Sequence, residues 1–286
     1  MHVERRTVSE LLARYELEPT LQDIYVEGTF DRDILSAFLS GGDSDLKFYE
    51  IGTVDIPADT LKRHKLTDGN KQRVVALARE LSVVDEHCKY VCVADKDLDH
   101  WLGSLEITPG LNWTKYTSIE LYFLRHDIMS SILVKACKIK TDDFDRLFTA
   151  LVELLSHLYA LRLANRYLEL NMRIVTFESS VTLKGGVPEL SIDEYVEKLL
   201  NSNAKSGHKA AFLEQYGRFK KLLDGDARER IHGHDLVCAL AWVVRSMKGI
   251  KETSSEIVLR RKFVLAACMD QQLADEMREL LSRRAA

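Results

Sequence analysis

The sequence contains little of the glycine and proline that mark flexible linkers, with 14 glycines and 4 prolines among 286 residues. It has no internal repeat and no low-complexity segment. A domain boundary must therefore be inferred from a change in residue pattern. At this length, the 46% hydrophobic content predicts a globular protein with one large or two modest domains.

Neither sign of charge dominates, and the formal net charge is -4. This balance excludes a simple polycationic nucleic-acid binder, although local basic patches remain compatible with nucleic-acid binding. The cysteines are scattered and lack the paired spacing of a zinc knuckle: Cys88, Cys92, Cys137, Cys238 and Cys268. We expect them to be reduced core thiols of a cytoplasmic protein.

Several motifs of other protein classes are absent. No G-x-x-x-x-G-K-[ST] occurs, so we expect no ATP hydrolysis by this chain. Leu39-Ser40-Gly41-Gly42 looks like an ABC-ATPase signature, but we interpret it as a glycine pair that ends a helix. The first residues lack the apolar stretch of a secretory signal, and we expect no apolar run of membrane-spanning length.

Strand and helix patterns alternate over the first 125 residues. We predict helices over 7–20, 32–39 and 70–81, the first capped by Thr7 or Ser9 with Glu10 completing a capping box for Thr7. Apolar runs predict strands at 23–26, 46–51, 90–94 and near 111–116. The alternation predicts an α/β domain at 1–125, with a parallel sheet flanked by helices.

The pattern becomes mainly helical over 126–286, which we predict to be a second domain. A long helix is expected over 144–170, because leucines recur there at helical spacing. Residues 173–183 have a β-like pattern, followed by a turn at Lys184-Gly185-Gly186 and by four or five amphipathic helices.

Carboxylates stand at the tips of two predicted strands and are the main functional signal. Glu27 follows the run 24–26, and Asp95 and Asp97 follow the run 90–94. Ligands of an open parallel sheet gather beyond the carboxyl ends of its strands, where the strand order reverses. If these strands are neighbours, the acids converge, and an extended backbone would point Asp95 and Asp97 the same way.

Carboxylates that lie so close repel one another, and a hard divalent ion such as Mg2+ or Mn2+ relieves that repulsion. Each motif alone has a simpler interpretation. Glu27 could face solvent at a strand end, and Asp-Lys-Asp-Leu-Asp at 95–99 could form a turn or a helix cap. Their joint occurrence in one α/β domain favours a metal site.

Val26-Glu27-Gly28 followed by Asp95-Lys96-Asp97 resembles the Toprim domain of topoisomerases, bacterial primases and OLD-type nucleases. The segments 25–31 and 116–122 more specifically resemble stand-alone OLD-like Toprim proteins encoded beside ABC-type ATPases in bacterial phage-defence islands. The resemblance is closest to the Toprim effector subunits of PARIS-type anti-phage systems. The motif at 231–237, Ile-His-Gly-His-Asp-Leu-Val, also looks like that family.

The resemblance implies a metal site of six carboxylates: Glu27, Asp31, Asp95, Asp97, Asp99 and Glu120. Glu27 corresponds to the Toprim glutamate, a metal ligand and general acid or base. Asp95 and Asp97 correspond to the two Toprim aspartates, which complete the catalytic set.

The other three acids have weaker assignments. Asp31 matches an acid that OLD-like nucleases carry one helical turn after the glutamate, for a second metal. Asp99 extends the cluster, and Glu120 matches the Ile-Glu position of the family. For Asp99 and Glu120, an alternative of equal weight is that each lies at a helix start, where its carboxylate interacts with the helix dipole.

A carboxylate-held metal without a nucleophilic triad suits phosphodiester hydrolysis, which indicates an Mg2+- or Mn2+-dependent nuclease. No tyrosine is marked as a topoisomerase nucleophile, and the zinc ribbon usual in primases is absent. Cations of the α/β half are the candidates for substrate binding: Lys62, Arg63, Lys65, Lys71 and Arg73.

Two further predictions concern residues outside this site. We expect most other basic clusters, such as 260–262, to be solvated faces. His232 and His234 flank Gly233, and we interpret them as part of a helix start capped by Asp235 rather than as metal ligands.

The resemblance also implies partners and a biological role. The chain would be a homodimeric toxic effector that an ABC-type ATPase partner controls, and it would cleave RNA, with tRNA as a candidate, in preference to DNA. The competing hypothesis is a non-catalytic Toprim-fold subunit for nucleic-acid binding or assembly. The helical half could serve dimerisation, substrate binding or ATPase docking.

Overall fold

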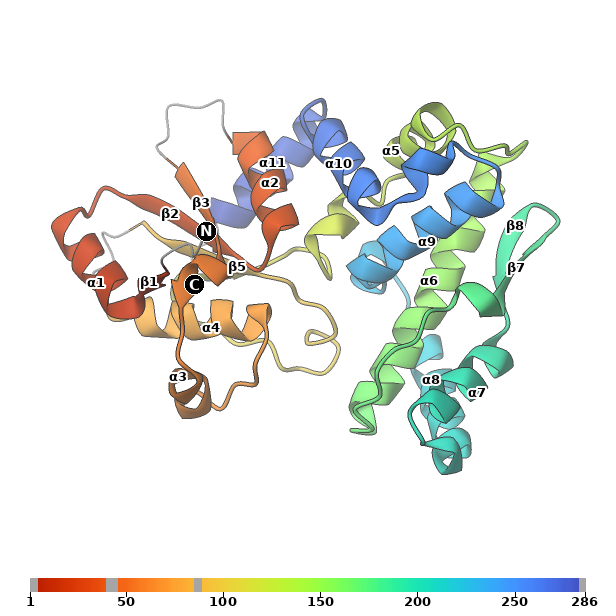
Figure 1. Cartoon of the computed structure of the whole chain (residues 1–286), viewed down its shortest axis with the longest axis horizontal. Coiled ribbons are helices and arrows are strands. Elements are labelled where there is room, and N and C mark those ends of the chain that lie inside the picture. The colour runs from red at the N-terminus through yellow and green to blue at the C-terminus, as the bar shows by residue number, and fades with distance from the viewer. Residues whose placement is uncertain (1–4, 40–45, 85–88, 283–286) are drawn as a thin grey trace. The chain divides into compact units, whose positions relative to one another are not determined.

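The computed structural model describes residues 5–39, 46–84 and 89–282. The chain forms two compact units (Figure 1). The first comprises Met1–Lys96, Ser104–Lys115 and Phe263–Ala286, and the second comprises Asp97–Gly103 and Tyr116–Lys262. The units depart from the division expected at residue 125, because residues 263–286 belong with the first unit and residues 97–103 with the second.

A four-stranded parallel sheet forms the centre of the first unit. Its strands are β2 (Gln22–Val26), β3 (Leu46–Glu50), β5 (Val91–Ala94) and β6 (Leu111–Trp113). Their order is β3-β2-β5-β6, so the strand order reverses between β2 and β5. Ile24 pairs with Val91 and Tyr25 with Cys92. The two strands that precede the acids are therefore neighbours, as the sequence-based argument requires.

Helices cover both faces of this sheet, which confirms the predicted α/β architecture. Figure 1 shows α2 (Thr29–Leu39) and α4 (Asn70–Leu81) on opposite faces. α4 shares a core with α1 (Val8–Leu17), to which Tyr25 and Cys92 of the sheet contribute. α2 packs against α11 (Gln271–Ser282), which also contacts β6.

The start of α1 follows its sequence signal. Thr7 is the N-cap, its hydroxyl accepts a bond from the Glu10 N–H at 3.2 Å, and the Thr7 N–H donates to Glu10 Oε2 at 2.6 Å. The predicted capping box is thus confirmed. The short strands β1 (Arg6–Thr7) and β4 (Val54–Asp55) pair beside it, and the short helix α3 (Ala58–Arg63) precedes α4.

The second unit is mainly helical, as predicted. Its helices are α5 (His126–Ser130), a π-helix (Ser131–Ala136), α6 (Phe144–Tyr167), α7 (Ile192–Ser202), α8 (Lys209–Leu222), α9 (Gly233–Ser246) and most of α10 (Glu256–Ala267). The β-like pattern at 173–183 corresponds to a strand only at its end. There, β7 (Val181–Lys184) forms a hairpin with β8 (Val187–Leu190). The Arg173 N–H bonds to the Asn203 side chain at 2.8 Å, so this part of the backbone is satisfied without a strand partner.

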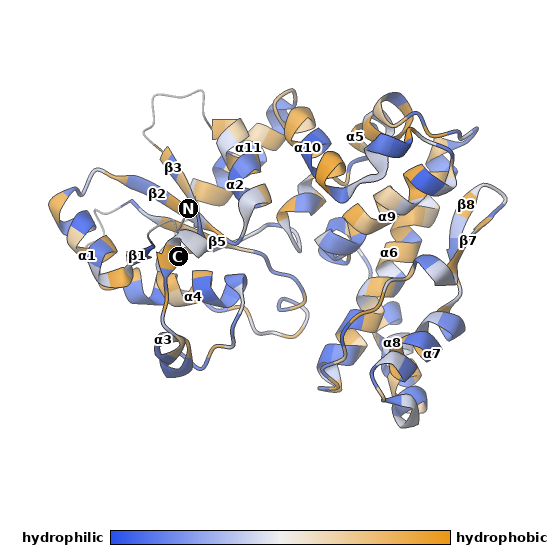
Figure 2. Ribbon diagram, in the orientation of Figure 1, coloured by the Kyte–Doolittle hydropathy of each residue, from blue (hydrophilic) through white to orange (hydrophobic). Residues whose placement is uncertain are grey.

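The helix α6 is long and apolar enough to cross a membrane by length and composition, contrary to our expectation. Most of its apolar stretch is buried inside the unit, where α6 packs against α8, α9 and β8. Figure 2 shows hydrophobic residues along both α6 and α9. The core helix of a protein passes the same test, so this is weak evidence for a membrane span.

The four described cysteines are free, as expected, but only Cys92 and Cys137 are buried. Cys238 is half-buried and Cys268 is exposed, so the prediction of core thiols is wrong for these two. Cys88 and the glycine pair 41–42 lie outside the described residues.

Candidate functional site

Glu27 and Asp95 meet at the carboxyl ends of β2 and β5. The backbone N–H of Asp95 donates a hydrogen bond to Glu27 Oε1 at 2.9 Å. Asn70, the first residue of α4, donates from its side chain to the Glu27 carbonyl at 2.8 Å. Both acids are half-buried. The first unit thus brings together the first acid of each motif at the point where the strand order reverses.

Asp31 lies in the first turn of α2, four residues after Glu27. Its Oδ2 accepts a bond from the Gly28 N–H at 3.0 Å. This contact satisfies one of the N–H groups left unpaired at a helix start, and the carboxylate interacts favourably with the dipole. Asp31 therefore has a structural role at the same turn that carries Glu27, beside any role as a ligand.

Asp97 does not continue the strand. β5 ends at Ala94, and Asp97 has a φ of 45°, in the left-handed region. The Asp97 N–H donates to the Thr117 carbonyl at 2.7 Å, and the Tyr159 hydroxyl donates to the Asp97 carbonyl at 2.6 Å. The extended backbone that we expected between Asp95 and Asp97 is therefore wrong, because these two bonds hold a turn.

Asp97 and Asp99 belong to the second unit, in the turns that span 97–103. The indole N–H of Trp101 donates to the Glu229 carbonyl at 2.8 Å and anchors these turns. Asp99 is half-buried within them, so it does not start a helix. His232 Nε2 lies 3.9 Å from Asp97 Oδ1, which brings the motif at 231–237 to this aspartate. Burial lowers the pKa of His232, so the imidazole is neutral at pH 7.

Glu120 is buried in the 3-10 helix Ile119–Phe123 and is only 7% exposed. It forms an ion pair with Arg260. Arg260 is therefore not part of a solvated face, contrary to our expectation for 260–262. Gly233, the first residue of α9, packs against Ser118 and Glu120. A Cβ at this position would collide with Ser118 Oγ and Glu120 Oε2.

The helix start at 233 is confirmed, but its predicted cap is wrong. His232 is the N-cap residue, and Asp235 lies inside the first turn of α9. The carboxylate of Asp235 accepts two bonds of 2.6 Å from the Arg162 guanidinium of α6. Burial by itself would raise the pKa of Asp235, but the Arg162 charge and hydrogen bonds lower that pKa below its usual value.

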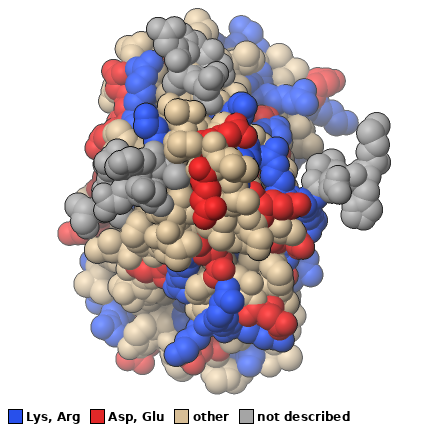
Figure 3. Space-filling model, turned by 90° about the vertical axis from the view of Figure 1, so that its left-hand side faces the viewer, with Lys and Arg blue, Asp and Glu red and all other residues tan. Residues whose placement is uncertain are grey.

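Most of the predicted substrate cations are paired with acids. Arg63 bonds to Glu80 at 2.6 Å, Lys62 approaches Asp59 at 3.4 Å, and Arg73 approaches Asp68 at 3.0 Å, as separate local pairs. Lys71 lies over the Trp113 ring, 5.4 Å from its centre, and Lys65 is exposed. Figure 3 shows interspersed basic and acidic residues, without a broad basic area among the described residues in that view.

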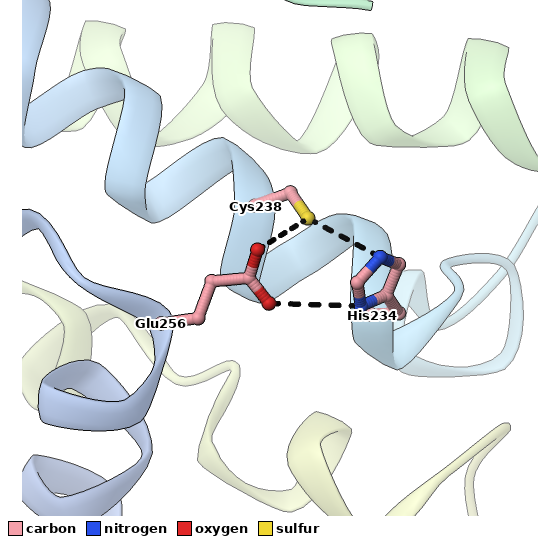
Figure 4. Close-up of side chains that lie close together, drawn as sticks. All are labelled: His234, Cys238 and Glu256. Atoms are coloured by element: carbon pink, nitrogen blue, oxygen red, sulfur yellow. Dashed lines mark hydrogen bonds and ion pairs between the residues drawn. The ribbon is translucent and has the colours of Figure 1, made fainter. Parts of the chain in front are cut away.

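A second cluster joins His234, Cys238 and Glu256 (Figure 4). The sequence reasoning set His234 aside as a metal ligand and did not consider Cys238 or Glu256. Their possible ligand atoms all lie within 4.8 Å of one another. The i, i+4 spacing of His234 and Cys238 is a usable signal in the sequence, because it places both on one helix face. Glu256 follows 18 residues after Cys238 and has no such signal.

The sequence matches no protein-family model, and no curated protein matches it.

Proposed function

We propose that the chain is a metal-dependent nuclease of the Toprim type, with Glu27, Asp95 and Asp97 as its catalytic acids. The observation that carries this proposal is the contact between the Asp95 N–H and Glu27 Oε1 at the tips of adjacent parallel strands. Buried strands that end in two acids at the reversal of strand order are typical of a ligand site rather than of a solvated edge.

The donor set supports Mg2+ or Mn2+. Carboxylate oxygens are the ligands that these hard ions prefer, and Asp31 adds a further carboxylate one turn after Glu27. A bound ion would supply activated water and stabilise the leaving oxygen of a phosphodiester. In this proposal, the Asp95 N–H fixes the Glu27 carboxylate in orientation, so that Glu27 can also transfer a proton.

The wider role follows from the sequence resemblance. The proposed protein is the toxic effector of a bacterial anti-phage system, a cytoplasmic homodimer that cleaves RNA, with tRNA as the first candidate. An ABC-type ATPase subunit of the same system would control it. The lack of a phosphate-binding loop in this chain supports a division of labour in which ATP hydrolysis belongs to the partner.

The test is cleavage of labelled tRNA and double-stranded DNA by the purified full chain with Mg2+ or Mn2+. We expect metal-dependent cleavage of RNA, which chelation stops and Glu27→Gln abolishes. The Asp226→Asn variant is the control, since Asp226 pairs with Arg228 on the surface of the second unit. Equal cleavage by wild type and Glu27→Gln would remove Glu27 from the mechanism.

The competing hypothesis, a non-catalytic binding or assembly subunit, predicts a different result. Such a protein would bind nucleic acid or a partner without cutting, and cells would tolerate its expression whether or not Glu27 is intact. A nuclease effector that lacks its ATPase should impair growth, and Glu27→Gln should relieve the impairment.

A further inference from the structure

The cluster of His234, Cys238 and Glu256 combines three kinds of metal-binding atom. Cys238 Sγ lies 3.5 Å from His234 Nε2 and 3.3 Å from Glu256 Oε1. His234 Nδ1 lies 3.8 Å from Glu256 Oε2. Figure 4 shows the three side chains converging, two from one face of α9 and one from the first residue of α10. One imidazole nitrogen, one sulfur and one carboxylate oxygen therefore lie within 4.8 Å of one another.

The backbone that carries these ligands is held in place. α9 is buried along Leu236, Val237 and Leu240, and the Arg162–Asp235 pair fixes its first turn. The segment between α9 and α10 is tied down by the Ile250 N–H, which donates to the Cys137 carbonyl at 2.8 Å. Arg245 donates to the Ser254 carbonyl at 3.3 Å, two residues before Glu256. Such support suits a preformed site.

The chemistry of the ligands distinguishes this cluster from the Glu27 region. Sulfur and imidazole nitrogen favour zinc and related transition metals, whereas oxygen ligands alone favour Mg2+ and Mn2+. Zinc in catalytic sites takes three protein ligands and leaves its fourth position to water, which is the number of ligands found here. The side chain of His234 is 56% exposed, which leaves the cluster accessible to solvent.

A nucleophilic cysteine is the main alternative for a Cys-His-Glu group. Cys238 Sγ donates its hydrogen to the Glu256 carboxylate, whose negative charge disfavours the thiolate that a nucleophilic cysteine needs. Binding of a metal ion would displace that proton and relieve the contact between sulfur and carboxylate.

We propose that His234, Cys238 and Glu256 bind one zinc ion, which links α9 to the start of α10 and keeps one coordination position for water. This site is separate from the catalytic acids in its residues and in its metal preference.

The test uses the purified full chain, stripped of metal and titrated with Co2+ as a spectroscopic substitute for zinc. We expect one equivalent of Co2+ to produce the near-ultraviolet thiolate-to-cobalt absorption and the visible bands of a four-coordinate ion, and Zn2+ to displace it. Cys238→Ser should abolish the thiolate absorption, and Glu256→Gln should weaken binding by more than about tenfold.

Two controls keep the result specific. Cys268→Ser removes an exposed cysteine that lies outside the cluster and should leave the absorption unchanged. Glu27→Gln should also leave it unchanged, so that failure of the nuclease proposal does not affect this one. Circular dichroism of Cys238→Ser checks that the variant is folded. Absence of the thiolate absorption in the wild type, or its persistence in folded Cys238→Ser, would overturn the proposal.

Discussion

The backbone N–H of Asp95 lies 2.9 Å from Glu27 Oε1, although the two residues are 68 positions apart in the chain. The contact exists because β2 and β5 are adjacent and parallel, so that their carboxyl ends reach the same edge. It fixes one oxygen of the glutamate through the main chain rather than through another side chain. The orientation of Glu27 therefore depends on the register of the sheet.

Because of this contact, Glu27→Gln separates an effect on cleavage from an effect on stability better than Glu27→Ala does. Glutamine keeps an oxygen that can accept the Asp95 N–H, so the free energy of unfolding should match the wild type, whereas alanine should lower it by about 0.5–1.5 kcal/mol. Under the proposed mechanism, both variants should lose about 10²- to 10⁴-fold in cleavage rate, because both lack the carboxylate that would transfer the proton. Urea unfolding and single-turnover cleavage of the same preparations separate the two effects. A Gln variant that cleaves at the wild-type rate would contradict the assignment.

The close packing at Gly233 predicts a position-specific effect of alanine. Gly233→Ala should lower the free energy of unfolding by about 1–3 kcal/mol, because its Cβ meets Ser118 and Glu120. Gly217→Ala is the matched control in α8, where an added Cβ meets nothing within 4 Å. That change should raise stability by about 0.5–1 kcal/mol through better helix propensity. Effects of the same sign in both variants would count against this packing.

The buried Arg162–Asp235 pair predicts a pH dependence of stability. The pKa of Asp235 is lower in the folded protein than the value of about 3.9 expected when unfolded. Its contribution is therefore complete above that unfolded pKa and is lost as the pH falls through the lower, folded pKa. Asp235→Asn should cost about 3–5 kcal/mol at pH 7, and the difference from wild type should shrink below about pH 4.

The control for this pair is Asp275→Asn, which breaks an exposed ion pair with Arg278. It should change stability by less than about 1 kcal/mol at any pH. Thermal unfolding at several pH values measures both variants. An Asp235→Asn protein as stable as wild type at pH 7 would show that the buried pair does not stabilise the fold.

The buried Asn112 predicts that β6 depends on α11. Its side chain donates to the Leu280 carbonyl at 2.8 Å, near the end of that helix. Asn112→Ala leaves the carbonyl without this partner and should cost about 1–3 kcal/mol of unfolding free energy. Hydrogen exchange should show faster exchange in α11. Unchanged exchange there would mean that other contacts hold the helix.

The sequence predicted the sheet well because its signals are local. The helix 70–81 is found at its predicted bounds, and Thr7 and Glu10 form their predicted capping box, since apolar spacing and capping depend on neighbouring residues. The adjacency of β2 and β5 was a condition of the sequence argument rather than a prediction, and the structure supplies it.

Several of the errors have a common physical cause in contacts between residues that are distant along the chain. The turn at Asp97 is held by Thr117 and Tyr159, and Asp235 is paired with Arg162 rather than capping α9. Arg260, which we expected on a solvated face, forms an ion pair with Glu120, 140 positions earlier in the sequence. Such partners leave no periodic pattern, so sequence spacing alone could not identify them.

The packing of α11 against α2 and β6 has a consequence for the order of synthesis. A ribosome makes Glu27 and Asp95 early, but residues 271–282, which pack against this part of the unit, are made only after the whole second unit. The first unit therefore cannot complete its fold while the chain is still growing through the second unit. A chain interrupted before α11 would have all four strands of this sheet but would lack the helix that packs against α2 and β6.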